Sequence, residues 1–146
     1  ALHRAIDGLS CTTAVHICYG YGIKANLEWK ASLGGKWTQY EAIFPALSAS
    51  RIKQASVEAR NSRVPVEPLP PPHHKGERVG AIDFARDTVE SADDGFQVIG
   101  RAAALVPVER IFPCTNCGMA PMKYDLAFAK LEALGAGAKL ARERLG

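Results

Sequence analysis

The chain has 146 residues, of which 47% are hydrophobic and 23% charged, and its net charge is +3 at neutral pH. This length and composition fit one soluble globular domain over residues 1–146. No apolar run approaches the ~18 residues of a membrane span, and the 18 basic residues are scattered, so we expect neither a membrane nor a nucleic-acid partner. The first residues lack the charged-then-apolar pattern of a secretory signal, and we expect a cytoplasmic protein.

The hydrophobic pattern predicts strands that alternate with helices or connectors. In chain order we expect a helix at 2–9, a strand at 12–18, partly helical sequence at 26–46, strands at 52–59 and 79–84, a helix at 88–105, a strand at 110–114 and a helix at 125–144. Gly34 and Gly35 interrupt the second helical stretch, and Pro45 is expected to close it. Strands separated by crossover segments are typical of a parallel sheet, so the predicted fold class is α/β.

The proline content of residues 65–76 and the acidic residues near 90 indicate the local structure of two further segments. Five prolines fall within residues 65–76, too many for a helix interior, so this proline-rich stretch is interpreted as an extended or disordered connector. Its neighbouring histidines, His73 and His74, are expected to be solvated. Three acids fall in the first turns of the helix predicted at 88–105, where the helix dipole favours negative charge: Glu90, Asp93 and Asp94.

Soft metal ligands gather at the predicted strand ends. His16 and Cys18 are two residues apart, so on a strand they point to the same face. Glu58 and Cys117 lie at or after the ends of two other strands, and the carboxyl ends of parallel strands meet at one mouth. Imidazole, thiolate and carboxylate are all zinc ligands, so these four residues are a candidate zinc site. The alternative is four unrelated residues, with the cysteines buried as small hydrophobic groups.

The other candidate residues have two interpretations each. Without a secretory signal, the four cysteines favour metal or catalytic use over disulfides. Cys114 and Cys117 form a C-x-x-C, which suits either a redox pair or a zinc site; we interpret Cys117 as the ligand and Cys114 as a packed core thiol. Asp83, at the end of the third strand, either positions a substrate amine or hydroxyl or caps the segment that follows.

Four segments carry a family resemblance. They are His16-Ile-Cys18-Tyr-Gly, Val57-Glu58-Ala-Arg60-Asn-Ser, Val79-Gly-Ala-Ile-Asp83 and Thr115-Asn-Cys117-Gly118-Met. Together, and in this order, they resemble the C-terminal catalytic barrel of cobalamin-independent methionine synthase, above all its short single-barrel members. The resemblance implies a (β/α)8 TIM-barrel type of fold, of which this chain has only the C-terminal half, about four parallel strands.

The resemblance also implies an activity. In the family a His-x-Cys, a glutamate and a later cysteine hold a catalytic zinc, and these positions fall here on His16, Cys18, Glu58 and Cys117. The implied protein is a zinc-dependent methyltransferase of methionine biosynthesis, which moves a methyl group from a methyltetrahydrofolate or corrinoid donor to the thiol of homocysteine. The alternative is a non-catalytic partial half-barrel that binds zinc or only pairs with another chain.

The chain departs from the family in two ways. The large members carry a histidine soon after the third strand, whereas residues 83–86 here read Asp-Phe-Ala-Arg. The earlier barrel strands are missing, which leaves two strand edges and, as we expect, an apolar inner face without cover. We therefore predict a homodimer, or a partner chain that supplies the missing barrel half.

Overall fold

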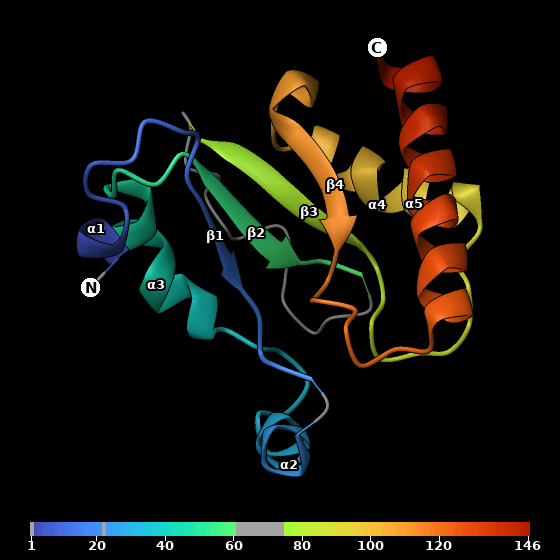
Figure 1. The fold of residues 1–146 in the computed structure, drawn as a ribbon, viewed down its shortest axis with the longest axis horizontal. Coiled ribbons are helices and arrows are strands. Elements are labelled where there is room, and N and C mark those ends of the chain that lie inside the picture. Colours follow the sequence, from blue (N-terminus) through green and yellow to red (C-terminus); the bar gives the residue numbers. More distant parts are fainter. Residues whose placement is uncertain (1, 22, 61–74) are drawn as a thin grey trace.

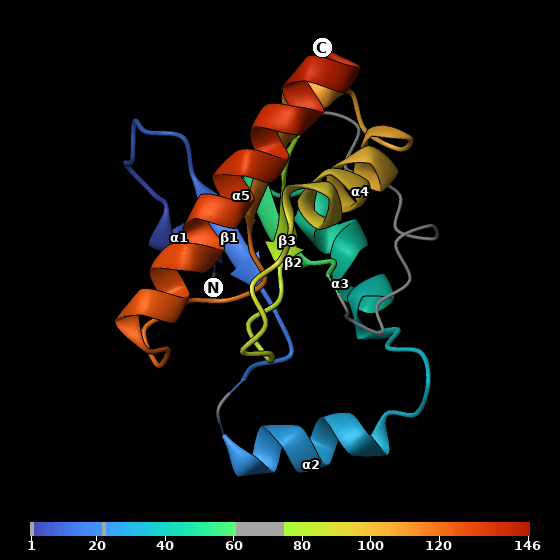
Figure 2. The same cartoon turned by 90° about the vertical axis from the view of Figure 1, so that its right-hand side faces the viewer.

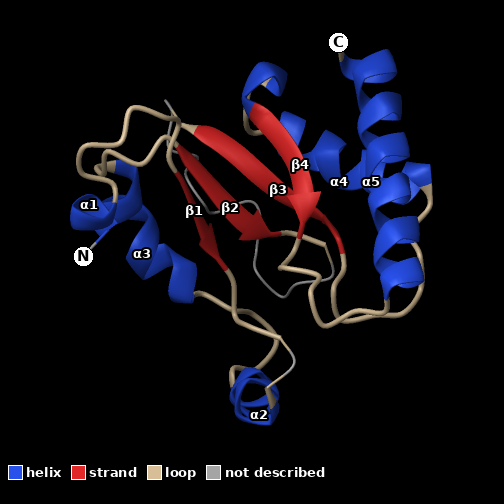
Figure 3. Cartoon of the chain, in the orientation of Figure 1, coloured by secondary structure: helices blue, strands red, loops and turns tan. Residues whose placement is uncertain are grey.

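One four-stranded parallel sheet forms the centre of the molecule (Figure 1, Figure 3). The computed structural model describes residues 2–21, 23–60 and 75–146. The strands are β1 (Ala14–Ile17), β2 (Gln54–Glu58), β3 (Gly76–Ile82) and β4 (Ile111–Thr115). Their order in the sheet is β1-β2-β3-β4, and each neighbouring pair is parallel. The predicted α/β class, with four parallel strands, is confirmed.

Five α-helices and one short 3-10 helix connect and flank these strands in the described part of the chain. They are α1 (Leu2–Ala5), α2 (Lys24–Ser32), α3 (Gln39–Ser48), α4 (Ala92–Ala103), the 3-10 helix η1 (Val108–Arg110) and α5 (Tyr124–Leu145). Helices α4 and α5 lie side by side, and α2 stands apart beyond the carboxyl ends of the strands (Figure 1, Figure 2). None of these helices is long and apolar enough to cross a membrane.

Helices α3, α4 and α5 pack against one face of the sheet, and the core lies between these helices and the strands. Val79 of β3 packs against Val98 and Ala102 of α4, while Ala55 of β2 packs against Leu47 of α3. These strand residues are apolar and alternate with polar ones, so a single face of each strand turns toward the helices. The core therefore covers the face of the sheet that turns toward the helices, and the opposite face stays open.

The open face is polar, which differs from the apolar inner face that we expected. His16 of β1 and Arg78 of β3 are exposed there, and the hydroxyl of Ser56 on β2 lies between His16 and Cys114. Phe112 is the large apolar side chain on this face, where its ring covers Gly76. The expectation failed because apolar strand residues such as Ala55, Val79 and Ala81 lie in the core on the helix side, so they do not contribute to the open face.

Pro45 does not close the second helical stretch, contrary to our prediction. It lies inside α3, which continues to Ser48, and the N–H of Ala49 donates to the Pro45 carbonyl at 3.1 Å. A proline within a helix loses one backbone hydrogen bond and costs ~3 kcal/mol. Phe44 and Leu47, on either side of it, are each 3% exposed, and their burial offsets that cost.

Glu90 is not an acid of the first turn of α4. The helix begins at Ala92 after its N-cap Ser91, so Glu90 precedes it and turns into the protein. The predicted positions of Asp93 and Asp94 in the first turn are correct. Of the proline-rich connector at 65–76, residues 65–74 lie outside the described residues, and Gly76 is the first residue of β3.

Candidate metal centre

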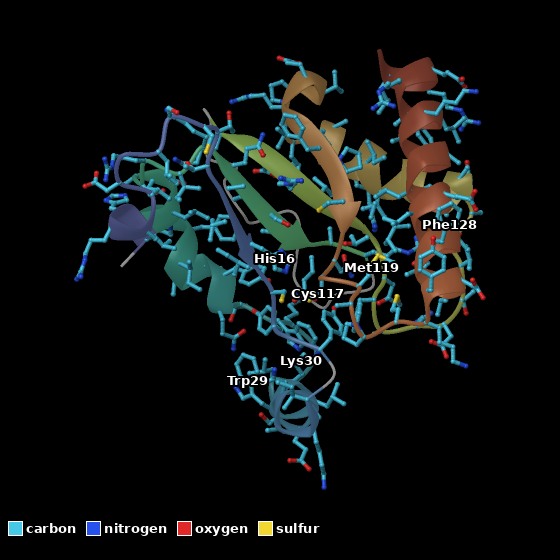
Figure 4. The ribbon with its side chains drawn as sticks, viewed as in Figure 1. His16, Trp29, Lys30, Cys117, Met119 and Phe128 are labelled. Atoms are coloured by element: carbon cyan, nitrogen blue, oxygen red, sulfur yellow. The ribbon has the colours of Figure 1, made fainter. Side chains whose placement is uncertain are left out.

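Three of the four predicted ligands meet at the carboxyl ends of the strands. His16 lies in β1, Cys18 follows the end of that strand, and Cys117 lies in the loop after β4. Their possible ligand atoms are all within 4.8 Å of one another, and Figure 4 shows His16 and Cys117 close together below the sheet. The parallel topology explains this, because it brings the ends of distant strands to one edge.

The sulfur atoms of this group fit a zinc ion. The Sγ atoms of Cys18 and Cys117 are 3.8 Å apart, and both cysteines are free thiols. Two sulfurs that bind one tetrahedral zinc at ~2.3 Å are themselves ~3.8 Å apart. The donor set of one imidazole and two thiols, with a carboxylate nearby, is also one that zinc accepts.

His16 is held in place by a neighbouring strand. Its Nδ1 lies 2.9 Å from the Oγ of Ser56, which is its registered partner on β2. Metal-binding histidines are commonly oriented by a hydrogen bond from the ring nitrogen that does not bind the metal. Ser56 therefore fits the part of an orienting residue for His16.

Burial and neighbouring charges oppose ionisation of the Cys18 thiol. Partial burial raises the pKa of Cys18, the backbone at Gly20 lowers it, and Cys117 and Glu58 raise it further. A cation among these groups would reverse that balance, because it favours thiolates. Without a cation, the negative charges of two thiolates and the Glu58 carboxylate would repel one another at this site. A bound cation would remove that repulsion.

Glu58, the fourth predicted ligand, lies at the same mouth but outside the three-residue group. It is 1% exposed, and its Oε1 accepts hydrogen bonds from the N–H of Tyr19 at 2.8 Å and from the hydroxyl of Tyr40 at 3.4 Å. Its Oε2 accepts a hydrogen bond from the hydroxyl of Tyr21. Burial and the bond to Glu58 raise the pKa of Tyr21, so this hydroxyl stays protonated. Hydrogen bonds from the backbone and from tyrosine hydroxyls therefore fix the Glu58 carboxylate.

Cys114 is outside the group and is not packed in the core. Its Sγ lies 3.6 Å from the Oγ of Ser56 on the open face, where it borders a cavity of about 260 Å³ with His16, Arg78 and Cys117. Burial raises the pKa of this thiol. Cys114 therefore stays protonated at neutral pH, and it faces the same cavity as the candidate ligands His16 and Cys117.

Asp83 has contacts of the capping kind. It is 3% exposed, its Oδ1 accepts from the N–H of Ala85 at 2.8 Å, and its Oδ2 lies 3.5 Å from the Nε of Arg86. Of the two interpretations from the sequence, these contacts fit a cap of the segment that follows β3. A part in positioning substrate stays a prediction.

Sequence reasoning missed Lys130, which supports the loop after β3. Its ammonium donates to the carbonyls of Asp83 at 3.0 Å and Thr88 at 2.6 Å, and to Glu90 Oε2 at 2.9 Å. Glu90 Oε1 in turn accepts from the N–H of Asp83 at 2.7 Å. A signal was present in the sequence, because Lys130 falls three residues before Ala133 on the buried face of α5.

Comparison with known proteins connects this chain to two longer proteins. No family model matches it. A curated relative, 2-hydroxypropyl-CoM lyase of Xanthobacter autotrophicus, is 25% identical over 168 residues, covering 99% of this chain and 45% of that protein. A solved structure, the B12-independent methionine synthase of Shewanella sp. W3-18-1 in complex with selenomethionine, is 50% identical with a TM-score of 0.92, covering 99% of this chain and 42% of that one.

These matches confirm the resemblance that the four sequence segments indicated. The fold of this chain is that of part of a methionine synthase barrel, and the agreement runs over nearly its whole length. The chain spans less than half the length of either relative. Compared with the methionine synthase structure, the chain corresponds to part of the barrel.

Proposed function

We propose that this chain is the zinc-binding part of a methyltransferase that makes methionine from homocysteine, with a methyltetrahydrofolate or corrinoid as methyl donor. The observation that carries the proposal is the group of His16, Cys18 and Cys117, whose ligand atoms lie within 4.8 Å of one another at the mouth of the sheet. The likeness to a methionine synthase at 50% identity supports the same conclusion. Glu58, at the same mouth, is the proposed fourth ligand.

The residues of the chain suit an attack by the homocysteine thiol on a methyl group. His16, Cys18 and Cys117 would hold the zinc ion, which would lower the pKa of a bound substrate thiol and so favour the thiolate at neutral pH. Cys18 and Cys117 present two sulfurs 3.8 Å apart, and Ser56 holds the imidazole of His16 beside them. The cavity on the open face reaches this group, which gives a substrate a path to it. The Shewanella relative was solved with selenomethionine, an analogue of the proposed product.

We infer that binding of the methyl donor and of the amino acid groups of the substrate involves barrel elements beyond the four described strands. The Shewanella relative is more than twice as long, and the sheet has four strands in the part of this chain that the structure describes. We propose that the further barrel elements come from a partner chain or a second copy. The alternative function, a half-barrel that binds zinc without catalysis, differs in one respect: methyl transfer would not appear when the missing half is supplied.

Metal content separates a zinc site from an unrelated gathering of residues. We expect about one zinc per chain in the purified protein, and Cys117→Ser should lower zinc affinity strongly because it removes one of the grouped sulfurs. Cys114→Ser is the matched control, since it changes a neighbouring thiol on the same face and should have little effect. Affinity is measured by competition with a chromophoric chelator. Equal loss from both substitutions would favour a C-x-x-C site and contradict the proposed ligand set.

A further inference from the structure

Both oxygens of Glu58 accept hydrogen bonds from the protein, although this residue is a proposed metal ligand. Oε1 accepts from the N–H of Tyr19, and Oε2 accepts from the hydroxyl of Tyr21. The backbone donor is fixed by the chain as it leaves β1. The hydroxyl of Tyr21 is a side-chain donor. A substitution can therefore remove its hydrogen bond to Glu58 and leave the backbone donor in place.

Of the three tyrosines around Glu58, Tyr21 makes the shortest hydroxyl hydrogen bond to the carboxylate. The Tyr40 hydroxyl has one proton and two acceptors, the Ile17 carbonyl at 2.9 Å and Glu58 at 3.4 Å, and the shorter contact takes the proton. Tyr19 directs its hydroxyl to Gln39 at 2.7 Å instead. The Tyr21→Phe substitution therefore removes one hydrogen bond from Oε2, whereas substitution of Tyr19 or Tyr40 leaves that bond in place.

The ring of Tyr21 is fixed on two sides. The ammonium of Lys30 lies 3.9 Å from its centroid, and the ring of Phe84 packs at 5.3 Å. Lys30 is itself held by the carbonyl of Gly20 at 2.6 Å. Figure 4 shows Lys30 at the near side of α2, below His16 and Cys117. The hydroxyl is thus aimed at Glu58 by packing from α2 and from the loop after β3.

We propose that Tyr21 is a positioning residue that competes with a bound metal for the Glu58 carboxylate. The proposal rests on the zinc site of the proposed function and adds a residue to it. His16, Cys18 and Cys117 are then the strong protein ligands, and Glu58 is a weak fourth ligand. A site with three strong ligands and one weakly held position suits the entry of a thiol substrate.

The test is zinc affinity of the full chain, measured by competition with a chelator. Tyr21→Phe should bind zinc about tenfold more tightly, because the lost hydrogen bond to a charged group no longer opposes coordination. Tyr19→Phe is the matched control, since it removes a hydroxyl that points to Gln39, and it should leave the affinity unchanged. Unchanged or weaker binding by Tyr21→Phe would overturn the proposal, and weaker binding would show that Tyr21 orients Glu58 for the metal.

A double substitution distinguishes this effect from a general change in structure. Glu58→Gln should lower zinc affinity more in the Tyr21→Phe background than in the wild-type chain, because the gain in affinity depends on a Glu58 carboxylate that no longer accepts the Tyr21 hydrogen bond. Equal losses in both backgrounds would overturn the proposal. If the wild-type chain binds no zinc, the proposed function itself fails; if it binds zinc and Tyr21→Phe shows no gain, only this inference fails.

Discussion

At the scale of single residues, Lys130 and Glu90 form a buried ion pair. Their side chains are 0% and 5% exposed, and the ammonium and the carboxylate are 2.9 Å apart. Such a pair costs desolvation energy, which is offset only when the remaining donors and acceptors are satisfied. Here the carbonyls of Asp83 and Thr88 and the N–H of Asp83 satisfy them. The pair therefore fixes the loop that follows β3 and connects it to α5.

Removal of one partner should be strongly destabilising. Lys130→Met leaves the Glu90 carboxylate buried without a cation, and we expect a loss of about 3 kcal/mol in the free energy of unfolding. Urea denaturation of the purified chain measures it. The double variant Lys130→Met with Glu90→Gln should lose less than the sum of the two single variants, because it leaves no buried charge. Additive losses would contradict a direct interaction between the two groups.

At the scale of elements, α4 begins with two reciprocal hydrogen bonds. The N–H of Asp94 donates to the Ser91 hydroxyl at 3.1 Å, and the N–H of Ser91 donates to the Asp94 carboxylate at 2.9 Å. Arg60, which follows β2, adds an ion pair to the same carboxylate at 2.8 Å. These bonds from Ser91, with Arg60, hold the pKa of Asp94 well below its usual range. The start of α4 is thus joined to the sheet through one carboxylate.

This cap predicts a pH dependence of stability. Because the pKa of Asp94 is lower in the folded chain than in the unfolded chain, its contribution is present above the unfolded value of about 4 and is lost as the pH falls below it. Asp94→Asn should lower the free energy of unfolding at pH 7 by about 1 kcal/mol. The difference from wild type should shrink as the pH falls from 5 to about 2. The exposed Asp87→Asn is the control, and a difference that does not change with pH would contradict the cap.

The elements and the site were predictable to different extents. Short runs rich in apolar and β-branched residues identified all four strands to within about three residues of their bounds. They also placed His16 and Cys18 at one strand end, since the spacing of two fixes a common face. The continuation of α3 past Pro45 was not predictable from local preference, because the burial of Leu47 offsets the cost of the proline.

What surrounds the candidate ligands depends on contacts between distant segments. Tyr21 reaches Glu58 across 37 residues, and Lys130 reaches Glu90 across 40. Tyr21 lies in a loop and Lys130 on a helix, and no periodic pattern states which side chain they will contact. The sequence therefore predicted which residue types gather at the strand ends, whereas the donors that hold them in place came only from the packing of the whole chain.

At the scale of the whole molecule, the sheet is open along both edges and on one face. Strands β1 and β4 are the edges, and each pairs on one side only among the described residues. An apolar groove runs beside β4, between η1 and the last turns of α5, with Ile99, Val108 and Leu145 in its walls. Unpaired edges and apolar grooves are features that proteins usually cover. Both relatives are more than twice as long as this chain, which is consistent with a cover supplied by further barrel elements.

Arg78 discriminates between the two assemblies that we expect, a homodimer and a pair with a different chain. It is exposed on the open face, and its guanidinium makes no hydrogen bond or ion pair with the described residues. A twofold dimer whose axis passes near Arg78 would bring two Arg78 side chains together, which is unfavourable when both lose water. A partner that carries an inward-facing carboxylate would pair with Arg78 instead. We therefore expect the charge on the open face to favour pairing with a different chain over a twofold dimer.

Sedimentation tests this assembly. At low micromolar concentration we expect the chain alone to self-associate weakly, and to form a stable one-to-one complex when co-expressed with the part of the Shewanella enzyme that it does not cover. Arg78→Glu should weaken that complex, because it places a negative charge opposite the expected carboxylate. Arg101→Glu on the exposed surface of α4 is the matched control and should leave the complex intact. A monomer that melts cooperatively and ignores the added half would contradict the requirement for a partner, because an open parallel sheet would then be stable with only the core between its strands and helices.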